Sequence, residues 1–159
     1  MNTPGAGKYL RLFIFVTPFL ITSCAKKDPT FTDLWNNRFN QCGVSCHSGA
    51  IDGTTDKGPV LTTKTEFYNN LVNKNVTTDY PDWVSELTGN CNSVNFITPG
   101  DANQSTLAAS LIQSVSTALS TSNNSCDTSY NVHSQVQVTI SDSTASDLIK
   151  WINAGAKND

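Results

Sequence analysis

The stretch Cys42-Gly43-Val44-Ser45-Cys46-His47 constrains the fold of this chain more than any other part of its sequence. Three residues separate its two cysteines, and a histidine follows the second cysteine directly. The whole chain of 159 residues holds five cysteines and two histidines, so this grouping rarely arises by chance. Two thiols beside an imidazole make the segment the first candidate for a functional site.

Upstream of this segment, the first 23 residues have the pattern of a signal peptide. Lys8 and Arg11 precede an apolar run, Leu12 to Ile21, and small polar residues follow it. Ten apolar-dominated residues are too few for a permanent transmembrane helix, which needs about 20. The sequence therefore predicts an exported protein whose leader, residues 1–23, is removed.

The end of this leader, Ile21-Thr22-Ser23-Cys24, resembles the lipobox of bacterial lipoproteins, whose cysteine becomes diacylated and forms the new N-terminus. Two acyl chains anchor a protein stably, where one does not. We therefore expect a lipid anchor at Cys24, a tether over residues 24–30, and a periplasmic or extracellular place in the bacterial cell envelope. Ordinary signal cleavage, which would leave Cys24 as a thiol or in a disulfide, is the alternative.

The mature chain is weakly acidic. Without Lys8 and Arg11 it keeps 8 basic and 13 acidic side chains, a net charge of −5. This balance leaves no basic patch for nucleic acid. Residues 31–159 are enough for one hydrophobic core, so a single domain is expected.

The apolar pattern of this domain predicts a mainly α fold with long loops. Apolar residues recur with helical spacing in four stretches: residues 30–41, the residues after the capping-box sequence Thr63-Lys64-Thr65-Glu66, Leu107 to Leu119, and the residues from Ser141 to Ile152. The Ser/Thr/Asn tract 116–129 is expected to be loop. Residues 135–140 alternate strictly between polar and apolar, which predicts a short extended segment before the last helix. Gly155 is placed to stop that helix.

Export also determines how the cysteines are interpreted, because thiols outside the cytoplasm are oxidised or otherwise capped. Cys91 and Cys126 stand 35 residues apart in loop-like surroundings, and a disulfide between them is the simplest use of both thiols. Pairing of either one with Cys42 or Cys46 is the alternative.

Covalent haem attachment requires two thiols that reach the vinyl groups of the porphyrin and an adjacent imidazole that reaches the iron. Cys42 and Cys46 would form the thioethers, and His47 would be the proximal iron ligand. The usual spacing is two residues between the cysteines, and here it is three. We expect a small bulge, made easier by Gly43, to absorb the extra residue. A Cys42–Cys46 disulfide beside a bystander histidine, or a zinc site, would use the same residues.

The chain resembles bacterial mono-haem cytochrome c domains of the extracytoplasmic lipoprotein type. Four parts carry the resemblance: an aromatic-bearing helix that runs into the Cys42–His47 segment, a glycine-rich loop that leads to Gly58-Pro59-Val60-Leu61, the segment Ile97-Thr98-Pro99-Gly100-Asp101 with Ser105 and Leu107, and the closing helix around Leu148-Ile149-Lys150-Trp151. The resemblance implies a small cytochrome c-like helical domain with one covalent haem.

The second axial ligand departs from this family's pattern, which commonly uses a methionine upstream of the last helix. The only methionine is Met1, which leaves with the leader. His133 stands 18 residues before Trp151, about where the methionine is expected. We therefore expect His133 as a possible distal iron ligand, with an open or water-ligated iron as the alternative.

The resemblance implies an electron carrier that is tethered to a membrane and serves a redox partner protein. The sequence shows no general acid/base pair, no Ser-His-Asp arrangement and no phosphate-binding glycine loop, so an enzyme is not expected. A catalytic haem with an open distal face, where His133 would transfer protons instead of ligating the iron, is the alternative. A haem-free lipoprotein stabilised by disulfides, acting as a structural or binding module, is the alternative function.

Overall fold

The computed structural model describes residues 27–45, 47–49, 59–80, 91, 94–122, 126, 130–135 and 137–159. The expected leader, the expected anchor Cys24 and the second motif cysteine, Cys46, lie outside these residues. Within them, no helix has the length and apolar character to cross a bilayer.

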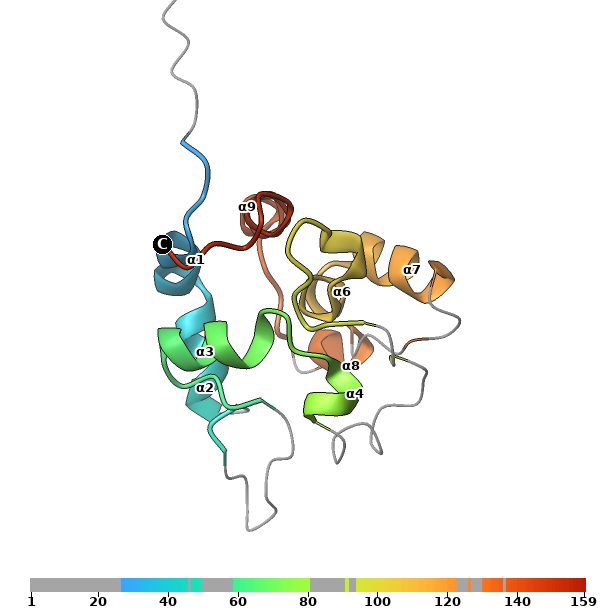
Figure 1. The fold of residues 1–159 in the computed structure, drawn as a ribbon, viewed down its shortest axis with the longest axis horizontal. Coiled ribbons are helices and arrows are strands. Elements are labelled where there is room, and N and C mark those ends of the chain that lie inside the picture. The colour runs from blue at the N-terminus through green and yellow to red at the C-terminus, as the bar shows by residue number, and fades with distance from the viewer. Residues whose placement is uncertain are drawn as a thin grey trace, which may run out of the picture.

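The described chain is mainly helical, which confirms the predicted fold class (Figure 1). Its elements are α1 (Phe31–Asn37), η1 (Phe39–Gln41), α2 (Cys42–Ser45), α3 (Lys64–Leu71), α4 (Val76–Asp79), η2 (Ala102–Gln104), α6 (Thr106–Leu111), α7 (Gln113–Ser122), α8 (Tyr130–Gln135) and α9 (Asp142–Asn153). Pairing between extended segments of the described chain is limited to isolated bridges, such as that of Val72 with Ile97.

Local capping starts the helices where the sequence predicts them. Thr30 and Asp33 form a reciprocal capping box at α1, and Thr63 and Glu66 form another at α3. Ser141 caps α9 by accepting a hydrogen bond from the backbone N–H of Thr144. Because each cap satisfies backbone donors within three residues of the helix start, the sequence alone indicates these boundaries.

The helix predicted around Leu107 to Leu119 is instead two helices, because Ile112 between α6 and α7 adopts an extended backbone (φ −129°, ψ 112°). Figure 1 shows α7 running at an angle to α6. The helix α7 also continues to Ser122, so the loop predicted from residue 116 begins later than expected. The hydroxyls of Thr117 and Thr121 donate to carbonyls four residues back, which makes this hydroxyl-rich tract compatible with a helix.

The extended segment predicted for residues 135–140 is shorter than expected. Gln135 closes α8, a helix that the sequence analysis did not predict, and Gln137 has a positive φ of 58°. Beyond it the predicted alternation holds, since Val138 and Ile140 are half-buried while Thr139 is exposed.

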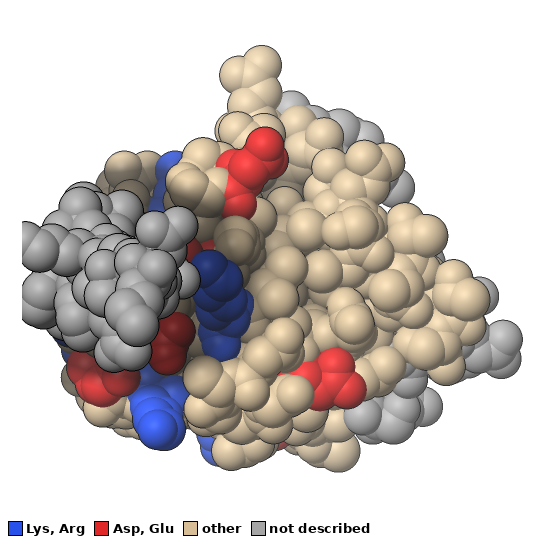
Figure 2. Space-filling model, turned by 90° about the horizontal axis from the view of Figure 1, so that it is seen from above, with Lys and Arg blue, Asp and Glu red and all other residues tan. Residues whose placement is uncertain are grey.

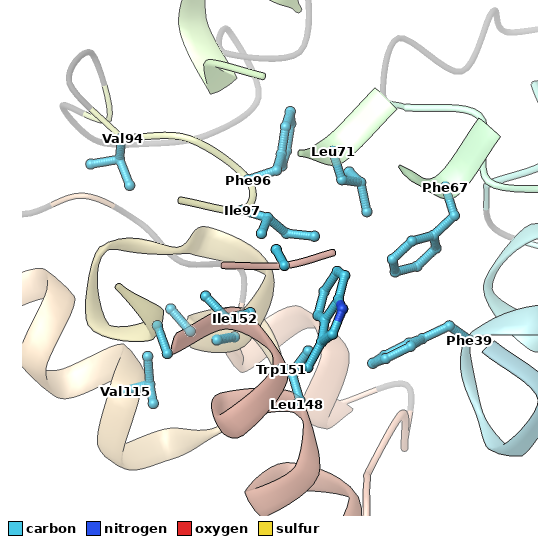
Figure 3. Close-up of a cluster of buried hydrophobic side chains, with 14 of the residues drawn as sticks. Phe39, Phe67, Leu71, Val94, Phe96, Ile97, Val115, Leu148, Trp151 and Ile152 are labelled. Carbon is cyan, nitrogen blue, oxygen red and sulfur yellow. The ribbon is translucent and has the colours of Figure 1, made fainter. Parts of the chain in front are cut away.

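An aromatic cluster joins α1, η1, α3 and α9, and Figure 3 shows three of its members, Phe39, Phe67 and Trp151. The ring of Phe31 stacks on Trp151 at 5.2 Å and lies 5.7 Å from Phe67 and 5.5 Å from Tyr68. The first and last helices therefore meet at Trp151. Trp35 packs edge-on against Phe67 of α3.

The C-terminal residues are hydrogen-bonded to the start of α1. The backbone N–H of Phe31 donates to the Asp159 side chain (2.7 Å), and that of Thr32 donates to the Asp159 main-chain oxygen (3.1 Å). The Lys64 ammonium donates to the same main-chain oxygen (3.0 Å). Gly155, at φ 100°, ends α9 as predicted and turns the chain toward this contact.

Cys91 and Cys126 form the predicted disulfide, and both side chains are 1% exposed. The bridge joins the segment before η2 to the segment after α7, so it closes a loop that contains η2, α6 and α7.

Replacing Cys91 and Cys126 together with alanine is expected to lower the free energy of unfolding by roughly 3 to 4 kcal/mol, because the unfolded chain then gains the entropy of the open loop. Urea unfolding followed by circular dichroism measures this loss. Alanine is chosen because serine would bury an unpaired hydroxyl at each site. The reduced wild-type protein should unfold like the variant, and a loss below about 1 kcal/mol would contradict the expectation.

Candidate functional site

The first half of the cysteine segment lies on the short helix α2, which continues from α1 and η1. Cys42 donates its backbone N–H to the Phe39 carbonyl, and its half-buried side chain packs against the hydrophobic core. The next residue, Gly43, is buried, whereas Val44 is 76% exposed. Cys42 and Gly43 thus face the core, and Val44 faces solvent.

His47 is held by three hydrogen bonds. Its backbone N–H donates to the Cys42 carbonyl (3.1 Å), and its own carbonyl accepts from the Leu61 N–H (2.9 Å). Its ring Nδ1 lies 3.1 Å from the Pro59 carbonyl oxygen. A carbonyl only accepts, so Nδ1 carries the proton in this contact and the neutral ring keeps its lone pair on Nε2. This is the arrangement in which histidines bind metals in proteins.

The Pro59 carbonyl owes its position to the segment formed by residues 59–62, which lies between α2 and α3. The Val60 carbonyl accepts from the Asn70 side chain (2.7 Å), and the Leu61 side chain is buried. The Thr62 hydroxyl donates to the Glu66 carboxylate. This hydrogen bond is the main reason that the pKa of Glu66 is lowered. The segment is therefore fixed to α3 at both ends.

Gly43 lies directly against this segment. A Cβ atom at position 43 would stand 2.4 Å from the Leu61 carbonyl oxygen and 2.4 Å from the Thr62 Cα. Both are backbone atoms, which cannot move aside as the end of a flexible side chain can. Gly43 was expected to make a small bulge easier. The structure gives it a further role, because Gly43 lies within the helix α2 and allows the close approach of two backbones.

The expected distal ligand, His133, lies in α8 and is half-buried. Its carbonyl accepts a hydrogen bond from the Val138 N–H (2.8 Å), and α8 packs against α6. Among the described residues, no three His, Cys, Asp or Glu side chains form a group that could hold a metal ion.

A hollow of about 310 Å³ lies at a different place, between residues 27–30 and the end of α9. Lys27, Asp28, Lys157 and Asp159 line it together with Trp151. Figure 2 shows charged side chains of both signs beside the grey residues on this face, while the rest of the face is mostly uncharged.

The sequence predicted neither the Pro59 carbonyl as the partner of the His47 ring nor the role of Asn70. The acceptor for the His47 ring is a main-chain carbonyl, and a carbonyl has no signature in the sequence. Asn70, which holds Val60, is one of two adjacent asparagines in α3, and the sequence marks neither of them as a partner for a main-chain carbonyl. The resemblance did place Pro59 in the family pattern, but it gave no partner for that residue.

Comparison of the chain with protein-family models, with curated proteins and with solved structures found no match.

Replacing Gly43 with alanine is expected to lower the free energy of unfolding by about 1 to 3 kcal/mol, because the added Cβ forces the 59–62 segment away from α2. Thermal and urea unfolding measure the change. The matched control is Val44→Ala, one residue further along the same helix and exposed, which should alter stability by less than about 0.5 kcal/mol. Equal effects of the two substitutions would contradict the packing argument.

Proposed function

We propose that this chain is a membrane-anchored c-type cytochrome that carries one covalent haem and transfers electrons in the periplasm or at the cell surface. Cys42 and Cys46 hold the haem through thioethers, and His47 is its proximal iron ligand. The observation that carries the proposal is the contact of His47 Nδ1 with the Pro59 carbonyl.

This contact matters because it prepares the imidazole before any metal arrives. The carbonyl fixes both the tautomer and the ring orientation, and it increases the electron density on Nε2. A surface histidine beside a disulfide would need none of this support. Here the 59–62 segment, the Asn70 amide and the Glu66 carboxylate all hold the accepting carbonyl in place.

The cysteine chemistry also fits the position of α2. Each thiol adds across one vinyl double bond of haem, so that sulfur bonds to one carbon, the thiol hydrogen goes to the other, and nothing is lost. Cys42 lies at the border between core and solvent, where one side of its surroundings is apolar. When bound, the haem supplies one-electron chemistry, and the chain determines its potential and access.

On this proposal His133 is the distal ligand, and it gives an iron with two imidazole ligands. Its side chain is half-buried, and the mature chain has no methionine to compete for the position. An iron with two histidines has a lower reduction potential than one with histidine and methionine.

The proposed anchor at Cys24 would keep this small electron carrier at a membrane. Six residues lead from Cys24 to Thr30, the N-cap of α1. The acyl chains would therefore hold the folded domain close to the bilayer surface.

The full chain, produced with its own leader in a bacterial host that matures c-type cytochromes, is expected to be red. Its mass should exceed that of the same chain from a host without this pathway by about 616 Da, the mass of one haem added without loss. The comparison between hosts cancels any lipid on Cys24. Haem staining on a denaturing gel should follow the polypeptide.

Replacing both Cys42 and Cys46 with alanine should abolish the added mass and the stain, whereas Val44→Ala should leave both unchanged. A colourless wild-type protein from the competent host would end the cytochrome proposal. It would favour the haem-free lipoprotein, for which the Cys91–Cys126 disulfide supplies the stabilisation.

Replacing His133 with alanine is expected to convert the reduced iron from low spin to high spin, because one strong-field ligand is lost. The absorption spectrum of the reduced protein measures this change. The control is Ser134→Ala, a neighbouring exposed residue, which should leave the spectrum unaltered. An unchanged low-spin spectrum in the His133 variant would show that another group ligates the iron.

A further inference from the structure

We infer that Val44 is a surplus residue in the turn from Cys42 to His47, so that the three-residue cysteine spacing positions His47 as a two-residue spacing would. This inference deepens the proposed function. The inference rests on that function where covalent haem is measured, whereas the measurement of thermal stability is independent of it.

The first step is the length of the turn. The His47 N–H donates to the carbonyl of Cys42, five residues earlier, whereas an α-helix joins residues four apart. In a segment with two residues between its cysteines, the histidine is the fourth residue after the first cysteine. The ordinary helical hydrogen bond would then join the same two groups. The turn here is thus wider by one residue, as in the five-residue hydrogen bonds that occur within and at the ends of helices.

The second step is the fixed frame around this turn. The His47 carbonyl accepts from the Leu61 N–H, and its ring meets the Pro59 carbonyl. Cys42 is held by its packing against the core. Both ends of the turn are therefore positioned by groups outside it, so the number of residues between them can change without moving the ends.

The third step identifies the residue that can be removed. Replacing Gly43 is unfavourable, because any Cβ at its position meets the backbone of Leu61 and Thr62. Val44 is the opposite case: its side chain is 76% exposed, the one large apolar side chain recorded as exposed in the described chain. Because the Val44 side chain is exposed, removing it takes little apolar surface out of the described core.

Two single-residue deletions test the inference, because both create a two-residue spacing. Deleting Val44 gives Cys-Gly-Ser-Cys-His, which keeps glycine beside the first cysteine. Deleting Gly43 gives Cys-Val-Ser-Cys-His, which puts a valine against the 59–62 segment. The midpoint of thermal unfolding should stay within about 3 °C of wild type in the first variant and fall by roughly 5 to 10 °C in the second.

Covalent haem per polypeptide, measured by haem staining and mass in the full chain from the competent host, should follow the same order. The Val44 deletion should carry haem within about two-fold of wild type, and the Gly43 deletion at least ten-fold less.

Equal behaviour of the two deletions would overturn the inference, as would a folded Val44 deletion that takes up no haem when wild type does. A wild-type chain without haem would instead overturn the proposed function, and the unfolding midpoints would still decide whether Val44 is surplus.

Discussion

The stacking of Phe31 on Trp151 is the contact on which the other parts of the structure depend. Phe31 is the first residue of α1, and its fully buried ring also touches α3 through Phe67 and Tyr68. The candidate site is built from the continuations of these same helices: η1 and α2 follow α1, and residues 59–62 precede α3. The aromatic cluster thus determines how α2 and the 59–62 segment meet, and the position of His47 follows from that meeting.

Much of the fold could be predicted from the sequence wherever a local interaction determines the structure. The capping boxes at Thr30 and Thr63 and the glycine stop at Gly155 each involve residues close together in the chain. The disulfide was predicted because the other cysteines already had roles. The break at Ile112 could not be predicted, since nothing in the surrounding sequence ends a helix there and the extended backbone appears only in the packed structure.

The same division holds for the candidate site. The sequence identifies Cys42 and His47 as side chains with chemistry, and the resemblance adds the Gly58–Leu61 stretch as a neighbour. The sequence does not show that the Pro59 carbonyl orients the imidazole of His47. Nor does it show that position 43 must be glycine because the backbone of Leu61 and Thr62 lies against it. Both facts concern main-chain atoms brought together by α1 and α3, and main-chain atoms are the same at every position of a sequence.

The direction of α1 has one more consequence. Residues 27–30 enter this helix at its N-terminal end, and α2 lies beyond its other end, on the far side of the molecule in Figure 1. The six residues after Cys24, up to Thr30, span about 21 Å at most. If the chain is anchored at Cys24 as proposed, its cysteine segment would face the aqueous phase, and a redox partner of the proposed cytochrome would reach it from the water.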